Sequence, residues 1–148
     1  MTRVLAFVLS ATLPFCAHAQ QGNEATDPTM IRPAETSDLS EFLWTNRPVI
    51  VFADTPADPR YGEQLALLQR DMDMLIERDV VVLTDTDPAA GSPLRKKLRP
   101  RGFQMVLVGK DGSVKLRKPF PYSVRELTRT IDKMPTRQQE IRERRAAG

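Results

Sequence analysis

Two continuous apolar runs, separated by one amphipathic segment, constrain the fold of this chain more than any other feature. The runs are residues 49–53 (VIVFA) and 80–83 (VVVL), and each is typical of a strand buried on both faces. Residues 59–78 between them predict a helix, because apolar side chains recur there at three- and four-residue steps: Tyr61, Leu65, Leu68, Met72 and Leu75. Strand, helix and strand in this order predict a right-handed βαβ unit with two parallel strands.

The second half of the chain predicts two antiparallel strands and a closing helix. Residues 104–108 and 113–117 flank a Gly-Lys-Asp-Gly segment, whose Asp-Gly pair indicates a β-hairpin. Ser123 and Glu126 then match a capping box that opens a helix. We therefore predict one α/β domain over residues 37–134, in which a βαβ–ββα order builds a mixed four-stranded sheet flanked by helices.

The first nineteen residues, 1–19, have the three parts of a secretory signal peptide. Arg3 supplies a positive start, residues 4–16 are apolar, and Ala17-His18-Ala19 offers small residues at the positions that a signal peptidase reads. We expect cleavage between Ala19 and Gln20, which would place the protein in the periplasm or outside the cell. The apolar run is too short to span a membrane, and we expect no transmembrane segment in the mature protein.

A lipid anchor on Cys16 is the alternative to this cleavage, but Phe15 is too bulky for the small residue that such processing needs. Residues 20–36 are polar and broken by prolines, which predicts a flexible linker. Residues 135–148 predict a polar helical tail, in which Ile141 alone is too little to pack strongly.

The leader also holds the only cysteine and the only histidine of the chain, Cys16 and His18. Without them, an exported protein has neither a thiol nor an imidazole, the groups that most often do nucleophilic and acid–base work near neutral pH. Thiol peroxidase and disulfide-exchange chemistry are therefore disfavoured. We expect no cofactor, and the composition favours a protein without catalytic activity over an enzyme.

A short acidic segment after the second apolar run begins like a calcium-binding loop. Asp85 and Asp87 stand where the first ligands of such a loop would be. However, Ala89, Ala90 and Lys96 occupy the positions of the next ligand, the glycine and the closing glutamate. We therefore predict a turn there and no metal site.

Two local segments resemble the thioredoxin superfamily. Residues 51–58 (VFADTPAD) are similar to the first strand and active-site loop of peroxiredoxins, with Asp58 in the position of the cysteine. Residues 102–112 (GFQMVLVGKDG) resemble the segment in which thioredoxins carry a cis-proline before the third strand, and Gln104 takes that position here. The resemblance implies a thioredoxin-like fold.

Residues 38–142 are more closely similar to a bacterial domain-of-unknown-function family that is peroxiredoxin-like and lacks redox cysteines. Related domains occur in animal extracellular proteins of the sushi-repeat-containing and coiled-coil-domain-containing kinds. This resemblance implies the fold and an extracytoplasmic setting, and it implies no activity. It is carried by residues 47–53 (RPVIVFA), 58–61 (DPRY), 109–112 (GKDG) and 134–140 (MPTRQQE).

Asp58 has two interpretations. As the residue before a helix, it can accept hydrogen bonds from free backbone N–H groups and act as an N-cap. Alternatively, it presents a carboxylate to a ligand in the former active-site cleft, whose candidate residues are Asp54, Thr55, Asp58, Arg60 and Gln104. In the second case the protein would be a non-thiol enzyme, with Asp54 or Asp58 as a general base and Arg60 holding an anionic substrate.

Charge is unevenly distributed along the chain. Residues 20–94 hold five Lys/Arg against fourteen Asp/Glu, whereas residues 95–148 hold sixteen against five. The simplest explanation is that the two halves neutralise each other across the folded surface. The functional explanation is a basic face for an anionic extracytoplasmic protein, glycan or lipid surface, formed by Arg95, Lys96, Lys97, Arg99 and Arg101. A nucleic-acid partner is disfavoured by the leader and by the lack of an aromatic-rich binding motif.

The leading hypothesis for function is an exported, redox-inactive binding or interaction module. It rests on a retained fold without a catalytic thiol and on the uneven charge. The carboxylate enzyme is the alternative, and the pKa of the cleft carboxylates separates the two. A strongly raised pKa favours the enzyme, whereas an ordinary or lowered pKa favours the cap.

Overall fold

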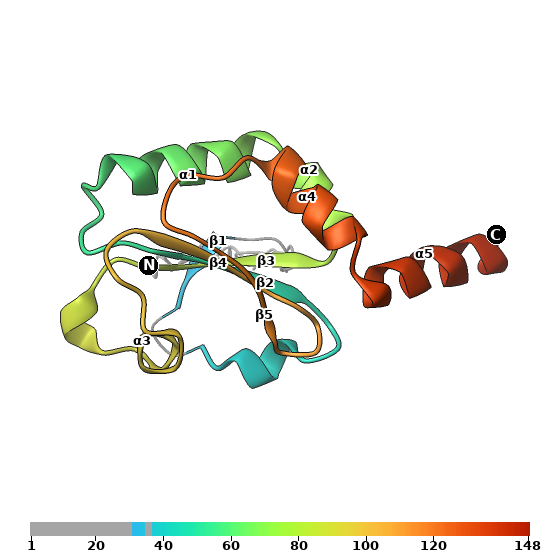
Figure 1. Ribbon diagram of the computed structural model, residues 1–148, viewed down its shortest axis with the longest axis horizontal. Helices are drawn as coiled ribbons and strands as arrows, with labels where there is room; N and C mark the ends of the chain where they lie inside the picture. The colour runs from blue at the N-terminus through green and yellow to red at the C-terminus, as the bar shows by residue number, and fades with distance from the viewer. Residues whose placement is uncertain (1–30, 35–36) are drawn as a thin grey trace, which may run out of the picture.

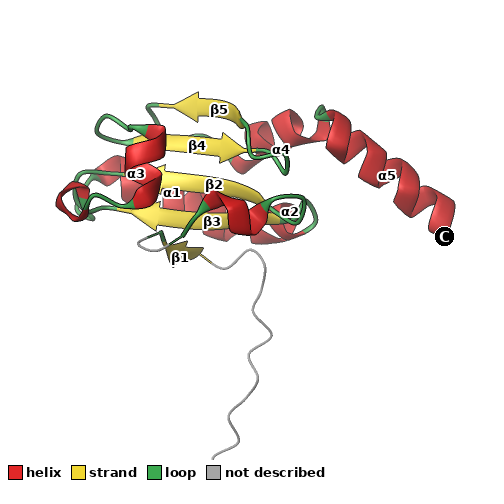
Figure 2. Ribbon diagram, turned by 90° about the horizontal axis from the view of Figure 1, so that it is seen from below, coloured by secondary structure: helices red, strands yellow, loops and turns green. Residues whose placement is uncertain are grey.

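The computed structural model describes residues 31–34 and 37–148, which fold into a five-stranded mixed sheet with helices on both faces (Figures 1 and 2). The strands are β1 Ile31–Pro33, β2 Arg47–Phe52, β3 Val80–Asp85, β4 Gln104–Val108 and β5 Val114–Lys118. Their spatial order is β1-β3-β2-β4-β5. β1, β3 and β2 run parallel, β4 is antiparallel to β2, and β5 is antiparallel to β4. The predicted βαβ–ββα order is confirmed.

The sheet has one strand more than the sequence predicts. β1 comes from residues 20–36, which the sequence indicates as a flexible linker, and it pairs in parallel with β3. Three residues are too few to show a periodic pattern, so this strand depends on the edge that β3 offers and not on its own sequence. The predicted signal peptide, with its cleavage position, lies outside the described residues.

Helices cover both faces of the sheet. They are η1 Leu39–Phe42, α1 Pro59–Arg70, α2 Met72–Ile76, η2 Pro88–Ala90, α3 Pro93–Leu98, α4 Val124–Asp132 and α5 Pro135–Ala147, where η marks a 3-10 helix. α1, α2 and α4 lie over one face, and α3 and η1 lie over the other (Figure 1). The predicted helix 59–78 is interrupted at Asp71, whose φ of −114° and ψ of 35° are not helical. Within the part of the chain that the structure describes, no helix has the length and apolar character needed to cross a bilayer.

The central strand β2 is buried on both faces. All six of its residues are buried. Val49 and Val51 pack with the α1 and α4 side, whereas Ile50 and Phe52 pack with the α3 and η1 side. This alternation explains why the sequence shows a continuous apolar run. It also fixes the end of β2, from which the loop of the candidate cleft starts.

A fully buried arginine at the start of β2 binds α5 to the sheet. The side chain of Arg47 is 0% exposed, and its guanidinium donates to both carboxylate oxygens of Glu140, at 2.8 and 3.3 Å. The ammonium of Lys110, in the turn between β4 and β5, lies 2.8 Å from the same carboxylate. Because a buried guanidinium without a counter-charge would be strongly destabilising, the contact with Glu140 holds the start of α5 in place.

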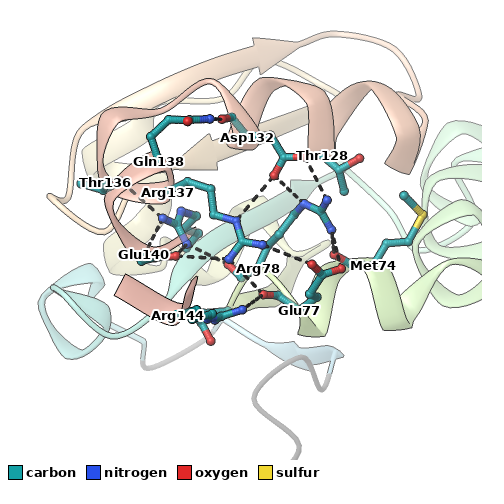
Figure 3. Close-up of polar contacts among 12 residues, drawn as sticks. Met74, Glu77, Arg78, Thr128, Asp132, Thr136, Arg137, Gln138, Glu140 and Arg144 are labelled. Atoms are coloured by element: carbon teal, nitrogen blue, oxygen red, sulfur yellow. Dashed lines mark hydrogen bonds and ion pairs between the residues drawn. The ribbon is translucent and has the colours of Figure 1, made fainter. Parts of the chain in front are cut away.

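A second arginine, Arg137 of α5, is buried beside this pair (Figure 3). Arg137 is 2% exposed, and its guanidinium donates to the backbone carbonyl and the carboxylate of Glu77, each at 3.3 Å. Nearby, Arg78 donates twice to the carboxylate of Asp132 in α4, at 2.9 Å each. The polar tail predicted over residues 135–148 thus packs through charged groups at its start. The sequence does not predict this contact because α5 has no apolar face, and the rest of α5 projects away from the sheet in Figure 1.

Replacing Glu140 by Gln should lower the free energy of unfolding by about 2–3 kcal/mol, because it removes the counter-charge of a buried guanidinium. Glu143→Gln is the matched control, since Glu143 is exposed on the same helix and accepts a hydrogen bond from Gln139. The control should change stability by less than about 0.5 kcal/mol. Denaturant unfolding followed by circular dichroism measures both variants.

The same prediction has a pH signature. Burial raises the pKa of Glu140, but the hydrogen bonds and charges of Arg47 and Lys110 outweigh burial and lower the pKa to about 2, from a usual value of 4.5. Since the folded state has the lower pKa, this stabilisation is complete above about pH 4.5 and is lost as the pH falls toward 2. Glu140→Gln should lack this part of the acid-dependent loss. An unchanged pH profile in the variant would contradict the role given to the carboxylate.

Candidate functional site

The candidate cleft lies where β2 ends and α1 begins. The loop over residues 53–58 leaves the C-terminal end of β2, and β3 ends at the same edge of the sheet because the two strands are parallel. Asp54 and Thr55 are exposed in this loop. The hydroxyl of Thr55 accepts a hydrogen bond from the backbone N–H of Ala57 at 3.3 Å, so it helps to close the turn.

Asp58 caps α1. Its backbone is extended (φ −61°, ψ 121°), and its carboxylate accepts a hydrogen bond from the backbone N–H of Arg60 at 2.9 Å. The same carboxylate accepts from the guanidinium of Arg60 at 2.8 and 3.1 Å. The side-chain hydrogen bond from Arg60 is the main cause that lowers the pKa of Asp58, and it outweighs burial. A carboxylate kept ionised in this way suits an N-cap and is poorly suited to act as a general base.

Two further candidates for the cleft also contact other residues of the chain. They are Arg60 and Gln104. The guanidinium of Arg60 lies 5.5 Å from the ring centroid of Phe103, in addition to its contact with Asp58. The side-chain oxygen of Gln104 accepts a hydrogen bond from Arg117 of β5 at 3.1 Å. The structure therefore brings Asp58 and Arg60 together, whereas the described hydrogen bond of Gln104 is made with β5.

Arg95 does not belong to a basic face. Its guanidinium donates to the carboxylate of Asp85 at 2.8 Å, and to the backbone carbonyls of Ala53 and Asp85 at 2.6 and 3.1 Å. It also lies 5.4 Å from the ring centroid of Phe52, and its side chain is 10% exposed. The prediction that Arg95 contributes to a basic face is wrong, because this side chain joins the ends of β2 and β3. A run of basic letters does not show which side of a short helix each residue occupies.

Asp85 is a buried site residue that the sequence patterns do not identify as such. Its carboxylate accepts a hydrogen bond from the hydroxyl of Ser92 at 2.5 Å and from the backbone N–H of Asp87 at 3.2 Å, in addition to Arg95. Since both carboxylate oxygens already accept hydrogen bonds, Asp85 organises the loop between β3 and α3. This loop borders a pocket of about 190 Å³, lined by Pro33, Thr84, Asp85, Thr86, Asp87, Ala90 and Ser92. The sequence feature that could have indicated the role of Asp85 is the Ser-Pro pair at the start of α3, because it places a helix-capping hydroxyl near the end of β3.

The other four residues of the predicted basic face are exposed: Lys96, Lys97, Arg99 and Arg101. None of them forms an ion pair with a residue that the structure describes. Elsewhere, cations of the basic half do pair with carboxylates of the acidic half, as Lys110, Arg137 and Arg144 show. The charge asymmetry is thus neutralised in part within the fold. A local excess of positive charge stays on α3 and the loop after it.

The fold is similar to that of solved peroxiredoxins. A reduced 2-Cys peroxiredoxin from Plasmodium vivax is 16% identical, with a TM-score of 0.55 over 70% of this chain and 85% of that chain. A Prx1a from Plasmodium yoelii is 17% identical, with a TM-score of 0.51 over 68% of this chain and 80% of that chain. These similarities establish the fold alone, and they confirm the predicted thioredoxin-like class.

Within this class, the chain belongs to the family described as "Domain of unknown function (DUF4174)", whose sequence profile matches residues 38–140. The predicted resemblance to a peroxiredoxin-like family of unknown function is therefore confirmed. The family description assigns no activity, so a function has to be argued from the residues themselves.

The pKa of Asp58 should lie below the usual aspartate range, and Arg60→Leu should raise it again, because the hydrogen bond from Arg60 is the main cause of the shift. An NMR titration of the side-chain carboxyl carbon measures this in both proteins. Asp38 serves as an internal control, since hydrogen bonds from Ser40 lower its pKa and Arg60 is not among the causes. A wild-type Asp58 pKa above the usual range would rule out the cap and favour the enzyme.

Arg95→Met should lower the free energy of unfolding by about 3 kcal/mol, because the carboxylate of Asp85 would stay buried without its cation. Lys96→Met, at an exposed position on the same helix, should change stability by less than about 0.5 kcal/mol. Thermal and denaturant unfolding of the two variants measure the difference. Similar stabilities for both would mean that Arg95 does not hold the strand ends together.

Proposed function

We propose that the protein is an exported, redox-inactive binding module whose basic face engages an anionic partner outside the cytoplasm. The basic face consists of Lys96, Lys97, Arg99 and Arg101. One observation carries the proposal: these side chains are neighbours in the sequence, are exposed and make no ion pair with described residues, whereas Arg95, Lys110 and Arg137 of the same half of the chain are paired within the fold.

The geometry of α3 supports a compact basic face. Leu94 and Leu98 are buried and lie four residues apart, so they fix the inward side of the helix and leave Lys96 and Lys97 outside. Arg99 ends the helix in the left-handed region (φ 48°), and Arg101 follows two residues later. Like charges on neighbouring residues repel one another, and a bound anionic group relieves that repulsion.

The redox-inactive part of the proposal is supported by the position equivalent to the peroxidatic cysteine. Asp58 occupies it and uses its carboxylate to cap α1. The described residues include neither cysteine nor histidine, since Cys16 and His18 belong to the predicted leader. Export itself is inferred from the positive, apolar and small-residue parts of that leader.

The carboxylate enzyme is less well supported. The lowered pKa of Asp58 opposes a role as a general base near neutral pH, and Arg60 is committed to the same carboxylate. Thr55 and Gln104 make hydrogen bonds that close a turn and contact β5, respectively. Asp58 and Arg60 thus satisfy each other, and Thr55 and Gln104 make hydrogen bonds with other parts of the protein.

Reversing the charge at Lys96, Lys97 and Arg101 to Glu should abolish capture of an anionic partner from the exported fraction by the purified protein. Arg99 is left unchanged because its left-handed backbone ends α3. Capture by the wild-type protein should weaken as salt rises, since exposed charges are screened.

The matched control reverses Arg125, Arg129 and Lys133, three exposed cations on or just after α4, so that both variants lose the same net charge. This control should retain the captured partner. If both variants retained it, or both lost it equally, the basic face would not be the binding surface.

A further inference from the structure

We propose that the outer edge of β5 binds an extended acidic peptide, which adds a sixth strand to the sheet. This inference rests on the proposed function, because it specifies that the anionic partner is a polypeptide strand. Its chemical signature is a segment of at least five residues that carries both acidic and apolar side chains.

β5 is the long unprotected edge of the sheet. It pairs with β4 on one side, and in Figure 2 none of the described helices or strands lies beyond its other side. Every second backbone N–H and C=O of an edge strand points outward and can pair with an added strand. The opposite edge is poorer, because β1 has three residues and ends at Pro33, which has no N–H to donate.

The side chains of β5 make this edge basic. Lys115 and Arg117 alternate with Leu116, and only Leu116 packs against the core beneath α1 and α4. Arg117 points to the other face, where its guanidinium donates to the backbone carbonyl of Leu98 at 2.8 Å. Lys118 lies 4.9 Å from the ring centroid of Tyr122. The strand itself contains no acidic residue, and of its cations Lys115 pairs with Asp111 in the preceding turn, at 3.0 Å.

The contact with Leu98 joins β5 to the basic face, because Leu98 directly precedes Arg99 at the end of α3. Side chains that an added strand directs to this side would meet Lys115, Arg117 and the basic face. Val114 pairs with Val108 across a bulge, so it lies on this same side and is 40% exposed, whereas the other side holds Leu116 and Lys118, which pair with Leu107 and Met105. Each side thus offers a cation and an apolar side chain, which fits a strand that carries both acidic and apolar residues.

Charge also selects against a second copy of the same edge. Two β5 strands paired with each other would bring the lysines and the arginine of one strand against those of the other, and like charges directly opposite are destabilising. An acidic strand converts the same residues into favourable cross-strand pairs. The basic residues that protect this edge from self-association therefore specify the chemistry of its partner.

The test uses a labelled peptide of alternating Glu and Val, eight residues long, and the purified protein without its predicted leader. Fluorescence anisotropy measures affinity, and NMR amide exchange locates the contact. Binding should protect outward-facing amides of β5. Two further peptides carry a methyl group on every second backbone nitrogen, one at the odd positions and one at the even positions. They test the contact without any change to the protein. One of these two registers should weaken binding about tenfold, because only one edge of the peptide can face β5.

Protein variants test the charge. Lys115→Gln with Lys118→Gln should weaken peptide binding about fivefold, whereas Arg125→Gln with Arg129→Gln should change it less than twofold at the same loss of charge. A peptide of alternating Lys and Val should not bind. Circular dichroism of each variant shows whether the fold is kept. The experiment with the methylated peptides uses the wild-type protein, so it does not depend on that outcome.

The outcomes separate this inference from the proposed function. If both methylated registers bind as well as the parent peptide, or β5 amides gain no protection, strand addition is wrong, although charge-dependent capture by the basic face can still hold. If anionic vesicles or a sulfated glycan bind in a manner that depends on Lys96 and Lys97 while the acidic peptide does not, the partner is not a strand. If none of these probes binds, both proposals fail.

Discussion

The buried guanidinium of Arg47 requires a counter-charge, and the arrangement of the elements around it depends on that requirement. It lies at the first position of the central strand, where β2 is flanked by β3 and β4 and water has no access. A charge in that position needs a carboxylate, and Glu140 supplies it from α5. The C-terminal helix is therefore a necessary part of the domain, although its sequence alone would allow it to be detached. Three of the four segments that carry the family resemblance, residues 47–53, 109–112 and 134–140, contribute to this cluster through Arg47, Lys110 and Glu140.

Ion pairs close the sheet at both ends of β2. Arg47 with Glu140 does so at its start, and Arg95 with Asp85 does so beyond its end. Each pair joins elements that are distant in sequence, and each uses a cation that a composition-based argument would count as surface charge. After these pairs are set aside, the charge that stays exposed is smaller and better localised than the sequence total indicates. It lies on α3, on the loop after α3 and on β5, and also on the exposed cations of α4 and α5.

The sequence predicts the elements whose signals are local and misses those that depend on partners. Both apolar runs, the hairpin and the caps at Asp58 and Ser123 form because periodicity and capping are properties of a few adjacent residues. β1 and the inward direction of Arg95 depend on residues far away in the chain, and no local pattern encodes them. In the candidate site, the position of Asp58 was predictable. Its closed pairing with Arg60 was not, because a cap and a ligand-binding carboxylate share the same sequence signature.

The carboxylate of Asp58 gives the start of α1 a chemical character different from that of a thiol. A thiolate at a helix start is stabilised by free N–H groups and still reacts, because sulfur is a strong nucleophile. A carboxylate in the same position takes those N–H groups, pairs with Arg60 and has no comparable reactivity. The entrance of α1 therefore contributes to stability, and the groups left to recognise another molecule are those that the fold has not used. In the described part of the chain, these include Lys97 and Arg99 on either side of Leu98 and the outer backbone of β5, which the bond from Arg117 to Leu98 brings together.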